Sequence, residues 1–164
     1  MDQQGAAQTG RDPALWSLIG DERRGWEELM ALLGSLTREQ MLLPGYFGEG
    51  WSVKDLLAHI AGWLAEAGLA LQQIRAGTFR ARDLDVDAMN AVFLDANRSQ
   101  PLTIVEAEAH AARHRLLLQV HELEGVTGDA AFWLRKAGPE HYDEHLPRLE
   151  EWVKDLHPGF SAGW

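Results

Sequence analysis

The residues best suited to chemistry in this sequence are its histidines. The chain holds seven of them and no cysteine, so a metal site made from its side chains has to use imidazole nitrogens and carboxylate oxygens. Two pairs of histidines are four residues apart, the spacing that brings two side chains to one face of a helix. These pairs are His110 with His114 and His141 with His145. Either pair is a candidate for metal binding.

The apolar pattern around each pair indicates which pair faces the interior. At about 100° per residue, His141 and His145 fall within or beside the apolar stripe of their helix. That stripe consists of Tyr142, Leu149, Trp152, Val153 and Leu156. Buried polar groups without partners are costly, so we interpret this pair as metal ligands, with hydrogen bonds to buried carboxylates as the alternative. The histidines outside the apolar stripe of their own helix are expected to face solvent or a partner chain: His110, His114 and His121.

A third imidazole comes from an earlier helix. His59 lies on the flank of the apolar stripe of residues 53–75, where a side chain can reach the groove between two helices. Three ligands from two helices, His59, His141 and His145, match a catalytic metal site that keeps a position open for water or substrate. Zn²⁺ is the default expectation, and Ni²⁺ and Fe²⁺ also suit imidazole.

Side chains near the late pair are candidates for proton transfer. Glu144 and Tyr142 are the first two, and Glu140 is a third. Residues 141–145 also fit the H-x-x-E-H pattern of inverted zinc proteases, in which Glu144 would be the general base. Glu144 falls on the helix between the histidine stripe and solvent, so we consider the three-histidine site the stronger hypothesis.

Seven tryptophans in one small chain favour an aromatic-lined cavity. Trp51, Trp63 and Trp152, together with Trp133, are the candidates to line an apolar pocket beside the metal. Ordinary core packing is the alternative interpretation of the same residues.

The elements that carry these residues are all predicted to be helices. Helix-start signals stand at Asp12 before Pro13 and at Ser52. Residues 37–40 and residues 103–106 each resemble a capping box, beginning at Thr37 and at Thr103. The pattern predicts long helices over 13–34, 53–75, 103–123 and 139–156, with shorter ones near 37–40 and 85–97. Glycines are expected to interrupt the chain at 125 and 128.

The predicted fold is an all-α, single-domain four-helix bundle with short additional helices. The bundle is expected to span residues 12–156, between a flexible N-terminus, 1–11, and a C-terminal tail, 157–164. The glycine-rich loop at 44–50 fits neither common phosphate-binding pattern.

Composition narrows the classes of partner. The net charge is −10 and the basic residues are scattered, so binding to nucleic acid or to an anionic membrane is not expected. No secretory signal or membrane-spanning run is recognisable, which predicts a cytoplasmic protein. A homodimer is possible, through residues 85–97 or the histidine face of residues 103–123.

The sequence also resembles a known superfamily. Residues 50–63, GWSVKDLLAHIAGW, are similar to the second helix of DinB-like proteins, and residues 140–147, EHYDEHLP, resemble the ClbS/DfsB branch, as do residues 98–102. The resemblance covers about residues 12–156. It implies a four-helix bundle with a metal held by one histidine of the second helix and a late H-x3-H pair, here His59, His141 and His145.

Relatives of that superfamily include thiol-dependent transferases and isomerases, among them the mycothiol-dependent maleylpyruvate isomerase. This chain differs from that branch in having His141 where glutamate is expected. Two functions follow as hypotheses. The first is a metal-dependent enzyme that acts on a small molecule by thiol-dependent transfer or isomerisation, or by hydrolysis, with a low-molecular-weight thiol as possible cosubstrate. The second is a small-molecule binding or sequestering protein, with a resistance or stress role, whose metal is not catalytic.

Overall fold

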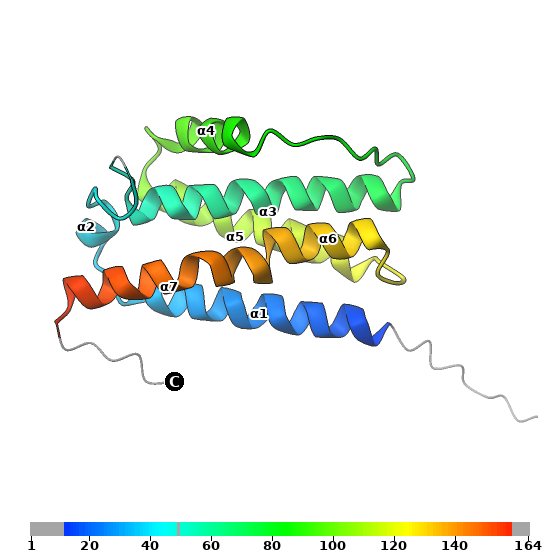
Figure 1. Ribbon diagram of the computed structural model, residues 1–164, viewed down its shortest axis with the longest axis horizontal. Helices are drawn as coiled ribbons and strands as arrows, with labels where there is room; N and C mark the ends of the chain where they lie inside the picture. Colours follow the sequence, from blue (N-terminus) through cyan, green and yellow to red (C-terminus); the bar gives the residue numbers. More distant parts are fainter. Residues whose placement is uncertain (1–11, 49, 159–164) are drawn as a thin grey trace, which may run out of the picture.

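Seven α-helices make up the described part of the chain, residues 12–48 and 50–158 of this computed structural model. Four long helices form a bundle and three shorter ones attach to it (Figure 1). The long helices are α1 (Pro13–Gly34), α3 (Val53–Arg75), α5 (Leu102–His121) and α7 (Pro139–Leu156); the short ones are α2 (Arg38–Met41), α4 (Val86–Asn97) and α6 (Gly128–Ala137). The predicted all-α bundle with short additional helices is confirmed.

Three helices begin at the predicted caps. The Asp12 carboxylate accepts a hydrogen bond from the backbone of Ala14, and Thr37 forms a reciprocal capping box with Gln40. Ser52 and Asp55 form a second box at the start of α3. Each of these side chains satisfies a backbone N–H that the helix itself leaves without a partner. The start of α3 is therefore fixed locally, two turns before His59.

The predicted capping box at Thr103 and Glu106 is wrong. α5 begins at Leu102, one residue earlier, and Pro101 occupies the cap position with no side-chain hydrogen bond. Thr103 therefore lies inside the first turn. Because the proline ring holds φ near the helical value, −58° here, the chain enters the helix directly after Pro101 without a side-chain acceptor.

The helix α6 is an addition that the sequence interpretation missed. Gly128 was expected to interrupt the chain, yet it is the first residue of α6. The hydroxyl of Thr127 accepts a hydrogen bond from the Ala130 backbone at 3.2 Å, so a cap just before the glycine begins the helix.

The helices pack in pairs around one apolar core. α3 packs against α5 and α1 against α7, and α6 and α7 follow one another almost end to end across the bundle (Figure 1). α3 consequently faces α6 as well as α5. The fully buried side chains of this core include Leu56, Ile60, Leu64, Leu71, Val105, Leu116, Leu149 and Val153.

α4 attaches to the outside of α3 and buries none of its own residues. The chain reaches it through residues 76–85, a non-helical stretch called the crossover segment below, which runs back along α3 (Figure 1). The Phe93 ring lies over Gly62, where any Cβ would overlap it. The Trp63 indole N–H donates to Asn90 Oδ1 at 2.8 Å. These two contacts hold α4 beside the part of α3 that carries His59.

A buried ion pair joins three of the long helices. The Glu22 carboxylate of α1 is completely buried and accepts hydrogen bonds from Arg113 Nε at 2.7 Å and Arg113 Nη2 at 2.8 Å, on α5. The Tyr142 hydroxyl of α7 donates to the same carboxylate at 3.0 Å. Gly25 permits this approach, because a Cβ there would stand 2.5 Å from the Tyr142 ring. The carboxylate therefore fixes how α1, α5 and α7 face one another.

Removing the cation of this ion pair should destabilise the fold strongly. We predict that Arg113→Met lowers the free energy of unfolding by about 3–5 kcal/mol, because it leaves the Glu22 carboxylate buried without a charge partner. Urea denaturation of the metal-free protein measures the loss. The matched control is Arg23→Met, which removes an exposed pair with Glu27 on α1 and should cost less than about 1 kcal/mol. Equal losses in the two variants would contradict the role given to Arg113.

Candidate metal centre

Three histidines from two helices meet between α3 and α7. His59 lies in the second turn of α3, while His141 and His145 lie one turn apart in the first half of α7. Tyr142 turns toward Glu22, so its neighbour His141 and the next-turn His145 turn toward α3, at about 100° per residue. His59 and His141 are buried and His145 is half-buried. The structure thus brings together the three residues that the sequence singled out.

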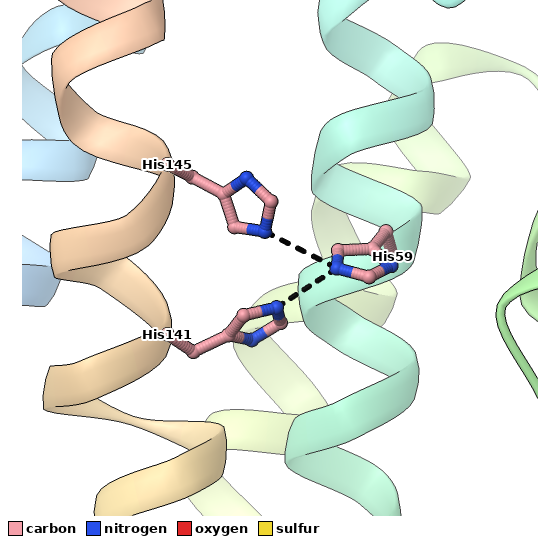
Figure 2. A group of neighbouring side chains, drawn as sticks. All are labelled: His59, His141 and His145. Atoms are coloured by element: carbon pink, nitrogen blue, oxygen red, sulfur yellow. Dashed lines mark hydrogen bonds between the residues drawn. The ribbon is translucent and has the colours of Figure 1, made fainter. Parts of the chain in front are cut away.

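The reactive nitrogens of the trio converge on one point. Nε2 of His59 lies 2.8 Å from Nε2 of His141 and 3.2 Å from Nε2 of His145, as Figure 2 shows. The three ring centroids are 4.7, 4.8 and 5.1 Å apart. Among the described residues, no carboxylate joins this group of potential ligands. The cluster is therefore purely imidazole.

Hydrogen bonds alone do not satisfy this arrangement. A neutral imidazole nitrogen has either one N–H or one in-plane lone pair, so Nε2 of His59 can form one good hydrogen bond and not two at once. Both other rings nevertheless point their Nε2 at it. A metal ion between the rings would accept all three lone pairs, and zinc–imidazole bonds of about 2.0–2.1 Å place neighbouring nitrogens at similar separations. The donor set fits a divalent metal.

Burial keeps these imidazoles neutral, the form that binds metal. It lowers the pKa of His59 to about 4, with His145 adding to the shift and the Asn90 side chain partly opposing it. Burial also lowers the pKa of His141 to about 3, and the other two rings add to that shift. The pKa of His145 is lowered by burial and is partly restored by Glu144. The three imidazoles therefore have lone pairs available to bind a cation at neutral pH.

A cavity of about 600 Å³ opens beside the trio, called the histidine cavity below. Its apolar wall comes from α3, α4, α6 and the crossover segment, and its polar wall from α4, α6 and α7. The apolar residues are Trp63, Leu84, Val86, Phe132, Trp133 and Ala137, and the polar ones besides the histidines are Asn90, Lys136, Glu140 and Glu144. A small molecule in this cavity would lie against the imidazoles.

The other predicted site residues divide into two groups. Glu144 and Trp63 line the histidine cavity, as does Trp133. Trp51 does not line it, but its ring lies 5.8 Å from that of His59.

Two predicted residues lie elsewhere. The Tyr142 hydroxyl is directed to Glu22, away from the imidazoles. Trp152, two turns beyond His145, packs edge-on against Tyr46 at 6.2 Å and is absent from the cavity wall. Helical periodicity correctly put Tyr142 and Trp152 on the buried side of α7. It could not tell which neighbouring segment each side chain contacts.

The three histidines of α5 behave as the apolar pattern predicts. His110, His114 and His121 are exposed, and His110 packs edge-on against Trp26 at 5.3 Å. The inverted zinc-protease arrangement receives no support. Glu144 is exposed on the cavity wall, and the third potential ligand near the late pair is His59 rather than a downstream acid.

Sequence reasoning missed two polar residues of the cavity. Asn90 reaches it from α4, where its Oδ1 is held by the Trp63 indole, and Lys136 reaches it from α6, paired with Glu140 at 2.6 Å. No periodicity marks either residue, because each lies on a short helix whose placement depends on the rest of the fold. The one available signal for Asn90 is a polar residue within the otherwise apolar stretch 88–94.

Metal content tests the trio directly. We predict about one divalent ion per chain in protein purified without an affinity tag, and loss of that ion in the double variant His141→Ala/His145→Ala, because structural and catalytic ions need three or more ligands. Elemental analysis measures it. The control is His110→Ala/His114→Ala, a pair of the same spacing on the exposed face of α5. Metal that persists in the first variant, or disappears equally from both, would count against the site.

The depressed pKa values predict how the metal-free protein responds to acid. Between about pH 6.5 and pH 4 the unfolded chain protonates His59 and His141 while the folded chain does not, so stability falls as pH falls. At pH 5 the expected loss relative to pH 7 is on the order of 2 kcal/mol for each of the two. Urea midpoints with a chelator measure it. In His59→Gln/His141→Gln the loss should be largely absent, and an unchanged loss there would contradict the assignment.

Comparisons with known proteins agree with the fold. A crystal structure of an uncharacterised protein from Escherichia coli UTI89 superimposes with a TM-score of 0.72 at 13% identity, covering 87% of this chain and 94% of that one. No curated protein matches the sequence. None of the described helices has both the length and the apolar composition of a bilayer-spanning segment.

A family match covers most of the chain. Residues 23–148 match the family described as the mycothiol maleylpyruvate isomerase N-terminal domain, which includes α3 and both late histidines. The resemblance to the DinB-like superfamily is thereby confirmed. The chain belongs to the mycothiol maleylpyruvate isomerase N-terminal domain family.

Proposed function

We propose that this protein is a metal-dependent enzyme that acts on a small molecule by thiol-dependent transfer or isomerisation, or by hydrolysis. The observation that carries the proposal is the convergence of three neutral imidazole nitrogens at the wall of an open cavity. Three protein ligands leave coordination positions for other groups, which is the arrangement of catalytic rather than structural zinc sites.

His59, His141 and His145 would hold the metal, and Zn²⁺ or Ni²⁺ suits three imidazole ligands best. When bound, such an ion supplies Lewis acidity, which lowers the pKa of a water or thiol and polarises a carbonyl group. The Glu144 carboxylate lines the cavity beside His145 and would hold a proton during the reaction. The Trp63 and Trp133 indoles exclude water from the apolar side.

A low-molecular-weight thiol is the proposed cosubstrate for transfer. The chain has no cysteine, so a sulfur nucleophile has to come from solution, and the family to which the chain belongs is described by a mycothiol-linked isomerase. Such thiols stay reduced in the cytoplasm, which is where we place the protein. Water would take the thiol's place in a hydrolytic reaction.

The second candidate function is binding or sequestration of an apolar small molecule, with a role in resistance or stress. The aromatic wall of the histidine cavity supports it. A homodimer is compatible with either function, because α4 buries no residue in one chain and leaves Val92 63% exposed.

Glu144 provides the sharpest test of catalysis. We expect Glu144→Gln to lower kcat by about 10²- to 10⁴-fold, the usual contribution of a positioned acid or base, without loss of metal. The assay measures turnover by the metal-loaded protein. An activated ester tests hydrolysis, and an activated aryl halide with a low-molecular-weight thiol tests transfer. Asp143→Asn, the adjacent exposed acid on α7, should retain full activity.

The outcomes separate the two functions. Turnover that needs metal and disappears in His145→Ala supports the enzyme. Absence of turnover, with stoichiometric tryptophan quenching by an apolar ligand that chelation does not alter, supports the binding protein instead.

A further inference from the structure

A second cavity adjoins the histidine cavity. It has a volume of about 690 Å³ and is called the outer cavity below. The two cavities share four wall residues, Leu84, Val86, Phe132 and Trp133. The two cavities therefore adjoin along α3, α6 and the crossover segment, which lie side by side in Figure 1, and the pair is called the trough below.

The trough is long and narrow. Along α3 its wall runs from His59 and Trp63, in the histidine cavity, to Glu66, Ala70 and Gln73, in the outer one. His59 and Gln73 are fourteen positions apart, which corresponds to about 21 Å along a helix. That length exceeds what a compact two- or three-carbon acid would occupy.

The chemistry of the trough changes along its length. Val86 and Phe132, in the shared wall, are 48% and 46% exposed, and Leu69, in the outer cavity, is 49% exposed; such a clustering of large apolar surface usually marks a binding site. The charges of Glu66 and Arg82 compensate each other at 3.4 Å. Arg80, Asp83 and Asp129 also border the outer cavity, so its wall carries three acidic and two basic side chains and only a small net charge. The walls thus favour a ligand with an apolar body and no large net charge at its far end.

We propose that the substrate is an elongated, largely apolar molecule whose reactive group meets the histidine trio while its body lies along the trough into the outer cavity. This inference rests on the proposed function for the position of the reactive group. The outer cavity is then a second subsite, which recognises the part of the substrate that does not react. Ala81, on the crossover segment, borders the outer cavity and not the histidine cavity.

Straight-chain hydroxamates of increasing length test the proposal on the metal-loaded protein, since a hydroxamate group binds divalent metals and the alkyl chain would follow the trough. Calorimetry should show binding about twofold to fourfold tighter for each added methylene that enters the trough, the upper value corresponding to complete burial. Ala81→Trp should leave acetohydroxamate affinity unchanged and remove most of the gain of the longest chains. Ala107→Trp, an exposed site on α5, should change neither.

A second series separates this inference from the proposed function. Straight-chain alkanols, measured on the chelator-treated protein, need no metal and should show the same dependence on chain length and on Ala81→Trp. If acetohydroxamate does not bind but the alkanols keep this dependence, the proposed metal-dependent function is contradicted and the proposal of an elongated apolar substrate is supported. If acetohydroxamate binds and chain length has no effect in either series, the proposal of an elongated apolar substrate is contradicted and the proposed metal-dependent function is supported.

Discussion

The buried carboxylate of Glu22 is the interaction on which the geometry of the site depends. An uncompensated carboxylate in a protein interior is very costly, so Arg113 and Tyr142 have to stay where they meet it. Tyr142 precedes His145 by three residues and follows His141 directly. Any rotation of α7 that moved the imidazoles away from α3 would also withdraw the tyrosine hydroxyl from Glu22. Tyr142 lies about 100° around α7 from His141 and about 60° from His145, so its contact with Glu22 keeps the two imidazoles in register toward α3.

The site was more predictable than the contacts that position it. The stripe on α7 identified His141 and His145 because helical periodicity determines which face of one helix is buried, and the caps at Asp12 and Ser52 located two helix starts because their hydrogen bonds are local. Glu22 and Arg113 are 91 positions apart, so no local pattern pairs them. The same limit explains why Asn90 was not predicted in the cavity wall and why Trp152 was wrongly expected there. Periodicity showed that Trp152 turns inward, but its partner Tyr46 comes from a loop whose course depends on the whole fold.

The two sides of the bundle are attached with different strength. α1, α5 and α7 are joined by the buried ion pair. α4 contacts α3 through a ring over Gly62 and one indole hydrogen bond, and the crossover segment contacts α3 through the exposed pair of Arg82 with Glu66. Lys54 secures the end of α4, where its ammonium donates to the carbonyls of Arg98 and Gln100 at 3.1 and 2.7 Å. α7, on the firmly held side, supplies two of the imidazoles and α3 supplies the third, whereas α4 and the crossover segment line the trough. Regions with few buried apolar contacts open at lower free energy than the core, so this division lets the cover adapt while the ligands remain fixed.

Burial keeps the three imidazoles neutral, and it also makes their clustering energetically unfavourable when no cation is bound. The desolvation that lowers the pKa of His59 and His141 keeps their lone pairs available at neutral pH, but it also holds three imidazoles together with fewer good hydrogen bonds than they can form. A ligand that binds the folded chain and not the unfolded one stabilises the fold by mass action. The residues that would bind a cation are therefore also those whose gathering destabilises the metal-free chain. In physical terms, such a cluster is better explained by a bound metal than by packing, because apolar side chains of the same size would fill the space between α3 and α7 without this cost.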